Sequence, residues 1–332
     1  MIPADIFPTQ YSMLSASALN VFLMQQYGFH DLTCRLLIHN VSDTYILENL
    51  CFKYIFKIYR TAHRSLTEIK GEVELLNTLK YGGAKVAFPI EDVHGEFIQS
   101  FNAAEGKRYG VLFAFAEGEV VDMNEAHLTT LGKEMAVVHT LSEGLELAHK
   151  RKEYNIDTML IEPLESIKPA FKGLEEEYAF LEEAVRLVID KMKALDFNTF
   201  GYGYCHYDYL PKNFHFQADG TLTFFDFDFA GKGYLVNDLA SLYAHYFLHV
   251  LFKKRSQEAA DAEFQIFVEG YRTVRPISEE ELRAIPYFGF AWWIFYFKFH
   301  HDHFEDWSNF FFTPRFIKER VGWLRKWMEW YL

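Results

Sequence analysis

Residues 205–231 read CHYDYLPKNFHFQADGTLTFFDFDFAG and combine a polar loop with a predicted β-hairpin. His206, Asp208 and Asn213 stand in the spacing H-x-D-x-x-x-x-N, and Asp226 follows thirteen residues after Asn213. An apolar strand precedes the loop, and the segments NFHF and LTFFDF are joined by Asp-Gly, a dipeptide typical of hairpin turns. Asp208, Asp226 and Asn213 therefore present two carboxylates and one carboxamide next to predicted strands.

This spacing matches the catalytic template of protein kinases, in which an Asp accepts the proton of the substrate hydroxyl while an Asn and a later Asp hold Mg²⁺. Such chemistry depends on positioning and charge neutralisation more than on covalent help from the protein. Asp208 is then the candidate base, and Asn213 and Asp226 are candidate ligands of Mg²⁺, which takes few carboxylates besides nucleotide phosphates. The alternative is a polar turn in which Asp and Asn only shape the backbone. We favour phosphoryl transfer because strand, loop and hairpin follow in the order that the template requires.

The composition describes an acidic globular protein. The 332 residues are 50% hydrophobic and 18% aromatic, and the formal net charge is −13. This length suffices for two sub-domains with a large core. No basic stripe of the kind that binds nucleic acids is visible, so we expect no nucleic-acid partner. The acidity would suit a cationic substrate, although it is equally an ordinary solubility feature.

Cysteine usage and the absence of sorting signals favour a cytoplasmic protein. Cys34, Cys51 and Cys205 form neither a C-x-x-C pair nor a metal-binding spacing. The opening residues MIPADIFPTQYS lack the basic and apolar regions of a signal peptide. The most apolar window, 285–297, is too short to span a bilayer. We expect a soluble protein with no membrane partner.

The first part of the chain has mainly β-type periodicity. An amphipathic helix predicted at 15–27 precedes three short β-type runs. A charged segment of helical period then closes on a glycine pair, and two more strands complete a five-stranded antiparallel sheet carrying one helix. The predicted strands are 33–40, 43–49, 53–60, one around 87–92 and one around 109–118, and the charged helix is 64–83.

From about residue 117 the periodicity is mostly helical, and the hairpin described above interrupts the helices. The predicted helices are 127–142, 175–195, 238–252, 261–274, 278–300 and 316–332. The sequence thus predicts an α+β fold of the bilobal, protein-kinase-like kind. Residues 1–116 would form a nucleotide-binding β-rich lobe, and residues 117–332 a helical lobe with the catalytic loop and the acceptor site.

The β-rich half also contains the Lys and Glu that the kinase template requires. Lys57 is the only Lys inside an apolar alternating run there, and a strand Lys can bind phosphate when a helix Glu holds it in place. Its alternative is a Lys on the solvent face of the strand. Among the helical candidates Glu68, Glu72 and Glu74, we favour Glu72 because it shares a helix face with Leu79, seven residues on.

No G-x-G-x-x-G motif is present to cover the phosphates. The turn HNVSDTYI between the first two predicted strands offers the Ser42 hydroxyl and the backbone N–H groups of Asn40, Ser42 and Asp43. Small polar side chains and turn amides can line an anion site without glycine. The same residues also make an ordinary turn, and the sequence does not decide between the two interpretations.

With these residues in view, the chain resembles the aminoglycoside phosphotransferase family of kinase-like enzymes, whose relatives include choline kinase and the second type of homoserine kinase. The resemblance rests on the order of a strand Lys, a helix Glu, H-x-D-x-x-x-x-N, DFDFAG and NDLA, and it covers essentially the whole chain. It implies that Asp208 is the base, that Asn213 and Asp226 bind Mg²⁺, and that Lys57, paired with Glu72, contacts the phosphates of ATP.

The resemblance implies further roles. Asp238 would support the catalytic loop, and the helix around His139 matches the family's helix after the hinge. Segment 112–119 resembles the hinge itself, whose backbone from Phe113 to Phe115 would hydrogen-bond adenine. One departure is Tyr207, where many relatives have a Gly, because a large ring beside the base would either narrow the acceptor site or pack away from it. Tyr209 and Lys212 are also bulkier than expected.

Three other groups of residues in the sequence have both a functional and a structural interpretation. The polar run 300–303, with three His and one Asp, lacks a complementary cluster and is interpreted as a solvated helix end. Asp228 would point to the same side as Asp226 in a regular strand and so could join the metal site, although a loop-stabilising role is favoured. The aromatic stretch 287–307 could line an acceptor pocket, since aromatic faces bind cations, but it is more often simple core.

The sequence therefore predicts an ATP- and Mg²⁺-dependent phosphotransferase that acts on a hydroxyl of a small molecule. Acidic helices at 174–190 and 278–282, together with the aromatic stretch, suit an acceptor that carries an amine, such as an amino alcohol, an amino acid or an aminoglycoside. The alternatives are a protein Ser/Thr kinase, which the short segment after Asp226 disfavours, and a catalytically silent nucleotide-binding scaffold (a pseudokinase).

Overall fold

The computed structural model describes residues 9–304 and 312–332. The opening segment considered above for a signal peptide falls largely on residues 1–8, and the end of the aromatic stretch falls on 305–307, so both lie outside the described residues. The chain divides into two compact units. The first comprises the residues up to Glu117 together with Leu147–Lys150, and the second comprises Gly118–Glu146 and Arg151–Leu332. None of the helices described is long and apolar enough to cross a membrane.

The first unit contains the predicted five-stranded antiparallel sheet. Its strand order is β1-β2-β3-β5-β4, so β3 lies at the centre between β2 and β5. The strands are β1 (Thr33–His39), β2 (Ser42–Glu48), β3 (Lys53–Tyr59), β4 (Ile98–Ala103) and β5 (Gly106–Ala114). The first three bounds agree with the predicted runs to within one residue.

The predicted fourth strand around 87–92 was wrong. That segment makes only a single bridge, Pro89 with Phe113, and backbone hydrogen bonds such as Ile90 N–H to Leu112 O at 2.8 Å. Proline has no N–H to donate to a ladder, which limits pairing at this point. The strand at the edge next to β5 is instead β4. It pairs with β5 in an antiparallel hairpin whose turn lies between Ala103 and Gly106.

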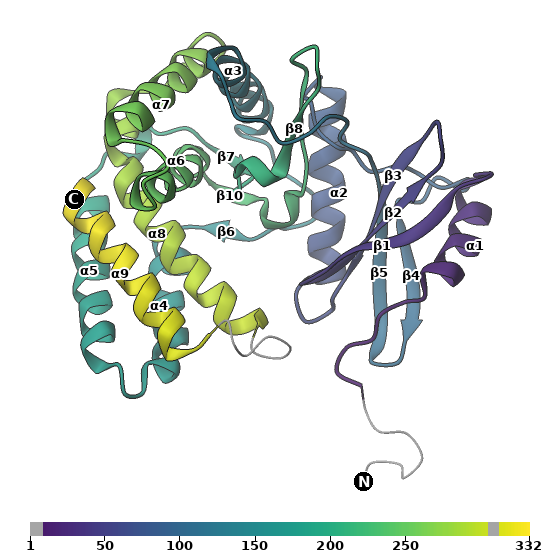
Figure 1. Ribbon diagram of the computed structural model, residues 1–332, viewed down its shortest axis with the longest axis horizontal. Helices are drawn as coiled ribbons and strands as arrows, with labels where there is room; N and C mark the ends of the chain where they lie inside the picture. Colours follow the sequence, from purple (N-terminus) through teal and green to yellow (C-terminus); the bar gives the residue numbers. More distant parts are fainter. Residues whose placement is uncertain (1–8, 305–311) are drawn as a thin grey trace. The chain divides into compact units, whose positions relative to one another are not determined.

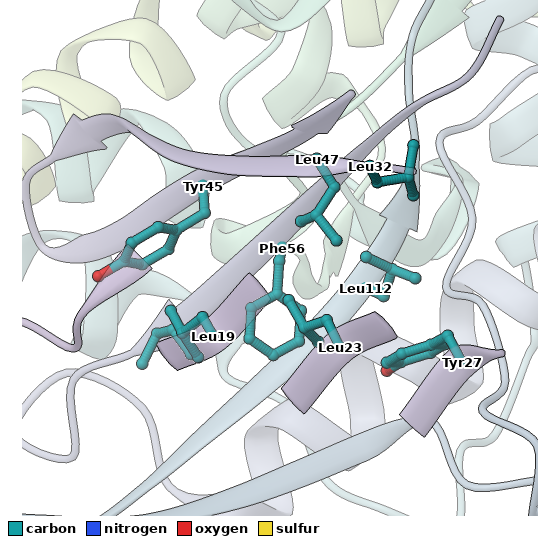
Figure 2. Close-up of a cluster of buried hydrophobic side chains, with 9 residues drawn as sticks. Leu19, Leu23, Tyr27, Leu32, Tyr45, Leu47, Phe56 and Leu112 are labelled. Atoms are coloured by element: carbon teal, nitrogen blue, oxygen red, sulfur yellow. The ribbon is translucent and has the colours of Figure 1, made fainter. Parts of the chain in front are cut away.

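Helix α1 (Ala16–Tyr27) covers one face of this sheet and fills its core. Figure 2 shows Leu19, Leu23 and Tyr27 of α1 directed toward the strand side chains, among them Phe56 and Leu112. Burial of such side chains stabilises the unit by roughly 1.5–3 kcal/mol each. Ser15 begins the helix by accepting the N–H of Ala18, and Gly28 ends it in the left-handed region, at φ 65°.

Helix α2 (Leu66–Tyr81) lies on the other side of the sheet from α1 (Figure 1). It begins with a capping box, in which Ser65 and Glu68 each accept the backbone N–H of the other. This arrangement satisfies two N–H groups that the first turn of a helix would otherwise leave unpaired. The predicted charged helix at 64–83 is thereby confirmed.

The second unit is mostly helical, as predicted. Its α-helices are α3 (Glu125–Ser142), α4 (Glu162–Ile167), α5 (Glu175–Lys193), α6 (Val236–Leu251), α7 (Gln257–Arg272), α8 (Glu279–Phe304) and α9 (Pro314–Tyr331). A small sheet of order β6-β10-β7 and the hairpin β8-β9 interrupt them. The strands are β6 (Glu153–Tyr154), β7 (Tyr202–Cys205), β8 (Phe214–Phe216), β9 (Leu222–Phe224) and β10 (Gly231–Tyr234). The sequence did not indicate β6, β10 or α4, all of which are short.

Candidate active site

The predicted catalytic loop begins where β7 ends, and Asp238 holds its first residues. The Asp238 carboxylate, in the first turn of α6, accepts the backbone N–H of His206 at 2.8 Å and that of Tyr207 at 2.6 Å. Its Oδ2 also lies 2.9 Å from Nε2 of His139 on α3. Both Asp238 and His139 are fully buried. The expectation that Asp238 supports the loop is therefore confirmed.

His206 is buried and connects the loop to the hairpin. Its Nδ1 accepts the backbone N–H of Asp208 at 3.2 Å, and its Nε2 lies 2.9 Å from the backbone oxygen of Phe225. The nitrogen that accepts carries no proton, whereas the nitrogen facing a carbonyl oxygen donates one. These partners assign the neutral tautomer protonated at Nε2. The ring thus fixes the position of Asp208 relative to the end of β9.

Asp208 is only 2% exposed, and its two oxygens have different surroundings. Oδ2 accepts Nδ2 of Asn213 at 2.7 Å and lies 3.0 Å from Nζ of Lys212. Oδ1 is buried and has no hydrogen-bond partner within residues 9–304 and 312–332. The carboxylate is therefore anchored through one oxygen, Oδ2.

Asn213 and Asp226 are brought together at the open end of the hairpin. Phe214 pairs with Phe224, and the backbone N–H of Phe225 donates to the backbone oxygen of Asn213 at 2.9 Å. Both N–H groups of the Asn213 carboxamide donate to Asp208, to its Oδ2 and to its backbone oxygen, so its own oxygen is what it can offer to a cation. One carboxamide oxygen with one carboxylate fits Mg²⁺, which keeps few protein ligands beside nucleotide phosphates.

The backbone departs from a regular strand at Asp226. This residue has φ 61°, in the left-handed region that non-glycine residues seldom adopt, and a 3₁₀ turn (Phe227–Phe229) follows it. The assumption that Asp228 lies in a regular strand beside Asp226 was therefore wrong. Arg151, which the sequence did not indicate, holds the turn by donating to the backbone oxygens of Asp228 at 2.6 Å and Ala230 at 2.7 Å.

Tyr207, the bulky residue between His206 and Asp208, is buried among aromatic side chains. Its ring is fully buried and stacks on Tyr154 with a centroid distance of 3.7 Å and an interplanar angle of 3°. The edge of Phe295 on α8 closes the stack at 4.9 Å. The structure therefore places the Tyr207 ring in the core of the second unit.

Helix α8 runs alongside the catalytic loop and contributes residues that the sequence identified only as an aromatic stretch. Nε1 of Trp292 donates to the backbone oxygen of Tyr207 at 2.9 Å, which ties the helix to the loop. Tyr296, one helical turn later, packs against Trp292 with a centroid distance of 4.2 Å and an interplanar angle of 43°. Burial, followed by the negative charge of Asp208, raises the pKa of Tyr296 well above its usual value. The i, i+4 spacing of the two rings was the signal available in the sequence.

In the first unit, Lys57 and Glu72 are both buried and lie on the same side of the sheet. Phe56 and Ile58, on either side of Lys57, pack into the core with α1, so the alternation of the strand directs Lys57 to the opposite face, where α2 lies (Figure 1). Lys57 is 8% exposed and Glu72 on α2 is 2% exposed. The interpretation of Lys57 as a solvent-facing strand residue is therefore wrong.

The two other helical candidates have separate roles. Glu68 belongs to the capping box that begins α2. The Glu74 carboxylate accepts the backbone N–H of Ala148 at 2.7 Å and that of His149 at 3.2 Å, and these bonds lower its pKa, outweighing the effect of burial. Of the three candidates, Glu72 is the buried one. It belongs neither to the capping box, as Glu68 does, nor to the contacts with segment 147–150, as Glu74 does.

The first hairpin offers fewer backbone donors than the sequence suggested. The N–H of Asn40 donates to the backbone oxygen of Ser42 at 3.0 Å, and Asp43 pairs with His39 in the β1–β2 ladder. The Asp43 side chain is fully buried against Arg108 at 3.0 Å. These contacts favour the ordinary turn for Asn40 and Asp43. Ser42 begins β2 and is largely buried.

The predicted hinge begins in the last part of β5. Phe113 pairs with Ile55 of β3 and forms the bridge to Pro89. The N–H of Ala114 donates to the backbone oxygen of Phe88 at 2.9 Å, so this donor is used within the unit. Phe115 follows the end of the strand, and Nζ of Lys53 lies 5.2 Å from the centroid of its ring.

No group of three or more His, Cys, Asp or Glu side chains is arranged to hold a metal ion in the described part of the chain. In the polar run at the end of α8, Asp302 pairs with His301 at 2.9 Å and with Lys298. A cavity of about 500 Å³ in the first unit lies between α2, β4, β5 and the segment 147–150, and Glu74, the candidate set aside in favour of Glu72, lines it.

Comparison with known proteins agrees with this arrangement. A sequence model described as a phosphotransferase enzyme family matches residues 34–277. An uncharacterised protein of Synechocystis is 29% identical over 298 residues, which are 88% of this chain and 80% of the relative. Amicoumacin kinase of Bacillus subtilis is 28% identical over 275 residues, 79% of this chain and 78% of that protein.

A solved structure of an amicoumacin kinase, in complex with AMP-PNP, Ca²⁺ and Ami, shares the fold. It superposes with a TM-score of 0.76 at 19% identity, covering 95% of this chain and 94% of that one. The match to the family model spans well over half of the chain and confirms the resemblance drawn from the sequence. The chain therefore belongs to the phosphotransferase enzyme family.

Proposed function

We propose that this protein transfers the γ-phosphoryl group of ATP, with Mg²⁺, to a hydroxyl of a small molecule that carries an amine. The observation that carries the proposal is the geometry around Asp208. It is a buried carboxylate anchored by Asn213 at one oxygen, with Asp226 following on the paired strand end. A carboxylate held in this way is suited to accept the proton of an attacking hydroxyl.

In the proposed reaction, Asp208 orients the acceptor hydroxyl and takes its proton as the new oxygen–phosphorus bond forms. Asn213 and Asp226 hold Mg²⁺, which when bound would neutralise charge on the phosphates. Lys57 contacts the α- and β-phosphates with Glu72 as its partner. Ser42, and the backbone from Phe113 to Phe115, complete the proposed nucleotide site.

Lys212 adds a feature to this site. Its ammonium lies 3.0 Å from Oδ2 of Asp208, although 61% of the lysine side chain is exposed. A lysine so close to the base supplies positive charge where negative charge accumulates during transfer. Such an exposed cation can reorient when a charged substrate binds, because among the described residues it is held by one ion pair, which solvent weakens.

The small-molecule acceptor is supported by the family and by the amicoumacin kinases among the relatives. The preference for an amine follows from the net charge of −13 and from the aromatic residues of α8 that lie next to the catalytic loop. An ammonium over an aromatic face gains roughly 0.5–2 kcal/mol. We infer an amino alcohol, a hydroxy amino acid or an amino sugar.

The test is a coupled ADP-release assay with Mg·ATP and a panel of 1-amino-2-propanol, L-homoserine and kanamycin. The wild-type protein should show acceptor-stimulated turnover with at least one compound. Asp208→Asn should lower kcat by roughly 10²–10⁴ while ATP binding, measured by calorimetry, stays within about threefold of wild type. Asp219→Asn, in the exposed hairpin turn, is the matched control and should leave kcat unchanged. An Asp208 variant that keeps more than about a third of wild-type kcat would exclude the assigned base.

A further inference from the structure

Two polar atoms beside the proposed base are buried without hydrogen-bond partners. In the described part of the chain, neither Oδ1 of Asp208 nor the hydroxyl of Tyr296 has one. Buried polar groups in folded proteins are nearly always hydrogen-bonded, so an exception calls for a ligand, a water molecule or a functional role. Here the exceptions come as a pair, because the Asp208 carboxylate acts on the Tyr296 hydroxyl both through its charge and as a side-chain hydrogen-bonding group, although neither atom makes a well-aligned hydrogen bond among the described residues.

The two atoms are complementary in chemistry. The Asp208 oxygen can only accept a hydrogen bond when the carboxylate is ionised, whereas the tyrosine hydroxyl can both donate and accept. Because the other Asp208 oxygen already has Asn213 and Lys212 as partners, Oδ1 is the one available to a substrate. A bound alcohol can donate a hydrogen bond to Oδ1 and accept a hydrogen bond from the Tyr296 hydroxyl.

Tyr296 is held rigidly enough to serve this purpose. Trp292 anchors α8 to the loop through its bond to the Tyr207 backbone oxygen, one turn before Tyr296. The Tyr296 ring packs against Trp292 at 4.2 Å, Phe229 at 5.6 Å and Phe295 at 5.6 Å between centroids. A side chain fixed by packing can orient a substrate with little further loss of conformational entropy.

We propose that Tyr296 positions the acceptor, whose reacting hydroxyl is bound between the Tyr296 hydroxyl and Oδ1 of Asp208. This inference rests on the proposed phosphotransfer. During the reaction the acceptor oxygen bonds to the γ-phosphorus, and the bond from that phosphorus to the β–γ bridging oxygen breaks. The acceptor proton passes to Asp208, and ADP leaves. Tyr296 keeps its own proton throughout and acts only as a hydrogen-bond donor.

The experiment compares Tyr296→Phe with Tyr246→Phe in the full-length protein. Tyr246 on α6 is the matched control, because its hydroxyl is also buried without a partner among the described residues, and it lies outside the proposed site. Tyr246→Phe removes no hydrogen bond made among the described residues, and Tyr296→Phe removes only the poorly aligned contact with Asp208, so Tm should change little in either variant. Tyr296→Phe should lower kcat/KM about 3- to 12-fold, the effect of one neutral hydrogen bond, mainly through a higher KM for the acceptor.

Two probes separate the hydroxyl contact from packing. For 1-amino-2-propanol the deoxy analogue is propylamine, and for L-homoserine it is L-2-aminobutyrate. Tyr296→Phe should leave the inhibition constant of the deoxy analogue and the KM for ATP unchanged. An equal loss of affinity for acceptor and deoxy analogue, or unchanged acceptor kinetics with an active wild type, would overturn the inference alone. Absence of any acceptor turnover in the wild type would overturn both it and the proposed function.

Discussion

Replacing Asp238 by Asn tests whether this buried carboxylate holds the catalytic loop. Its Oδ1 accepts the N–H of Tyr207, and its Oδ2 accepts the N–H of His206 and faces Nε2 of His139. Asparagine has the same shape but only one oxygen. In the more favourable orientation of the carboxamide, this oxygen takes the place of Oδ2 and keeps His206 and His139 as partners. The new NH₂ group then faces the N–H of Tyr207, so the charge-assisted hydrogen bond to Tyr207 is lost.

The expected loss of stability follows from the loss of this one hydrogen bond. A hydrogen bond to a charged group contributes about 1.5–3 kcal/mol, and the donor left unpaired is buried. For a unit of this size, 1 kcal/mol changes Tm by about 2–4 °C, so the unfolding transition of the second unit should fall by about 3–12 °C. Because the loop positions Asp208, kcat should fall about tenfold or more, whereas the KM for ATP should change little.

Calorimetry and the coupled assay measure these two effects on the same samples. Asp219→Asn is the control, since Asp219 is exposed and accepts a single backbone N–H, that of Thr221 at 2.9 Å. Its stability should stay within about 0.5 kcal/mol of wild type. A Tm for Asp238→Asn within 1 °C of wild type, with normal kcat, would refute the view that the Asp238 charge fixes the loop.

Three further predictions concern metal binding, pH and ionic strength. Asp226→Asn should weaken ATP binding in Mg²⁺ but not in EDTA, because it removes a charged oxygen from a cation with few protein ligands. Burial, and then nearby positive charge, lowers the pKa of His245 from 6.5 to about 3. The unfolded chain therefore takes up the proton first as pH falls below 6.5, so between pH 7 and 5 the wild type should lose about 2 kcal/mol more stability than His245→Phe. The KM for 1-amino-2-propanol should rise with salt, which screens charges over about 8–10 Å.

Each of these has its own contrary result. Equal losses of ATP affinity in Mg²⁺ and EDTA would make Asp226 structural. Urea unfolding with the same pH dependence in wild type and His245→Phe would mean that another group causes the acid destabilisation. A KM for 1-amino-2-propanol that does not change with salt concentration would mean that the acidic charge of the chain serves solubility and does not attract the acceptor.

Much of the architecture could be predicted from the sequence because it depends on local chemistry. Alternation of apolar and polar residues located β1, β2 and β3 to within one residue, and Asp-Gly marked the turn between β8 and β9. Helical period located α2 and the long helices of the second unit. Where local signals conflicted with tertiary pairing, prediction failed, as at 87–92, whose apolar run contains Pro89 and leaves the edge position to β4.

The sequence by itself also determined which chemical groups are present and in what order, because the spacing from His206 to Asp226 requires only a loop and a hairpin. Only the tertiary structure decided their partners. His139 and Asp238 are 99 positions apart and meet beneath the loop, and Tyr296 reaches Asp208 from α8. Arg151 fixes the turn after Asp226. The left-handed backbone conformation of Asp226 was not predicted by any sequence pattern. The physical reason is that the periodicity of a segment indicates only which of its faces is buried. Contacts between distant segments depend on how those buried faces pack against one another, and no single segment determines that packing.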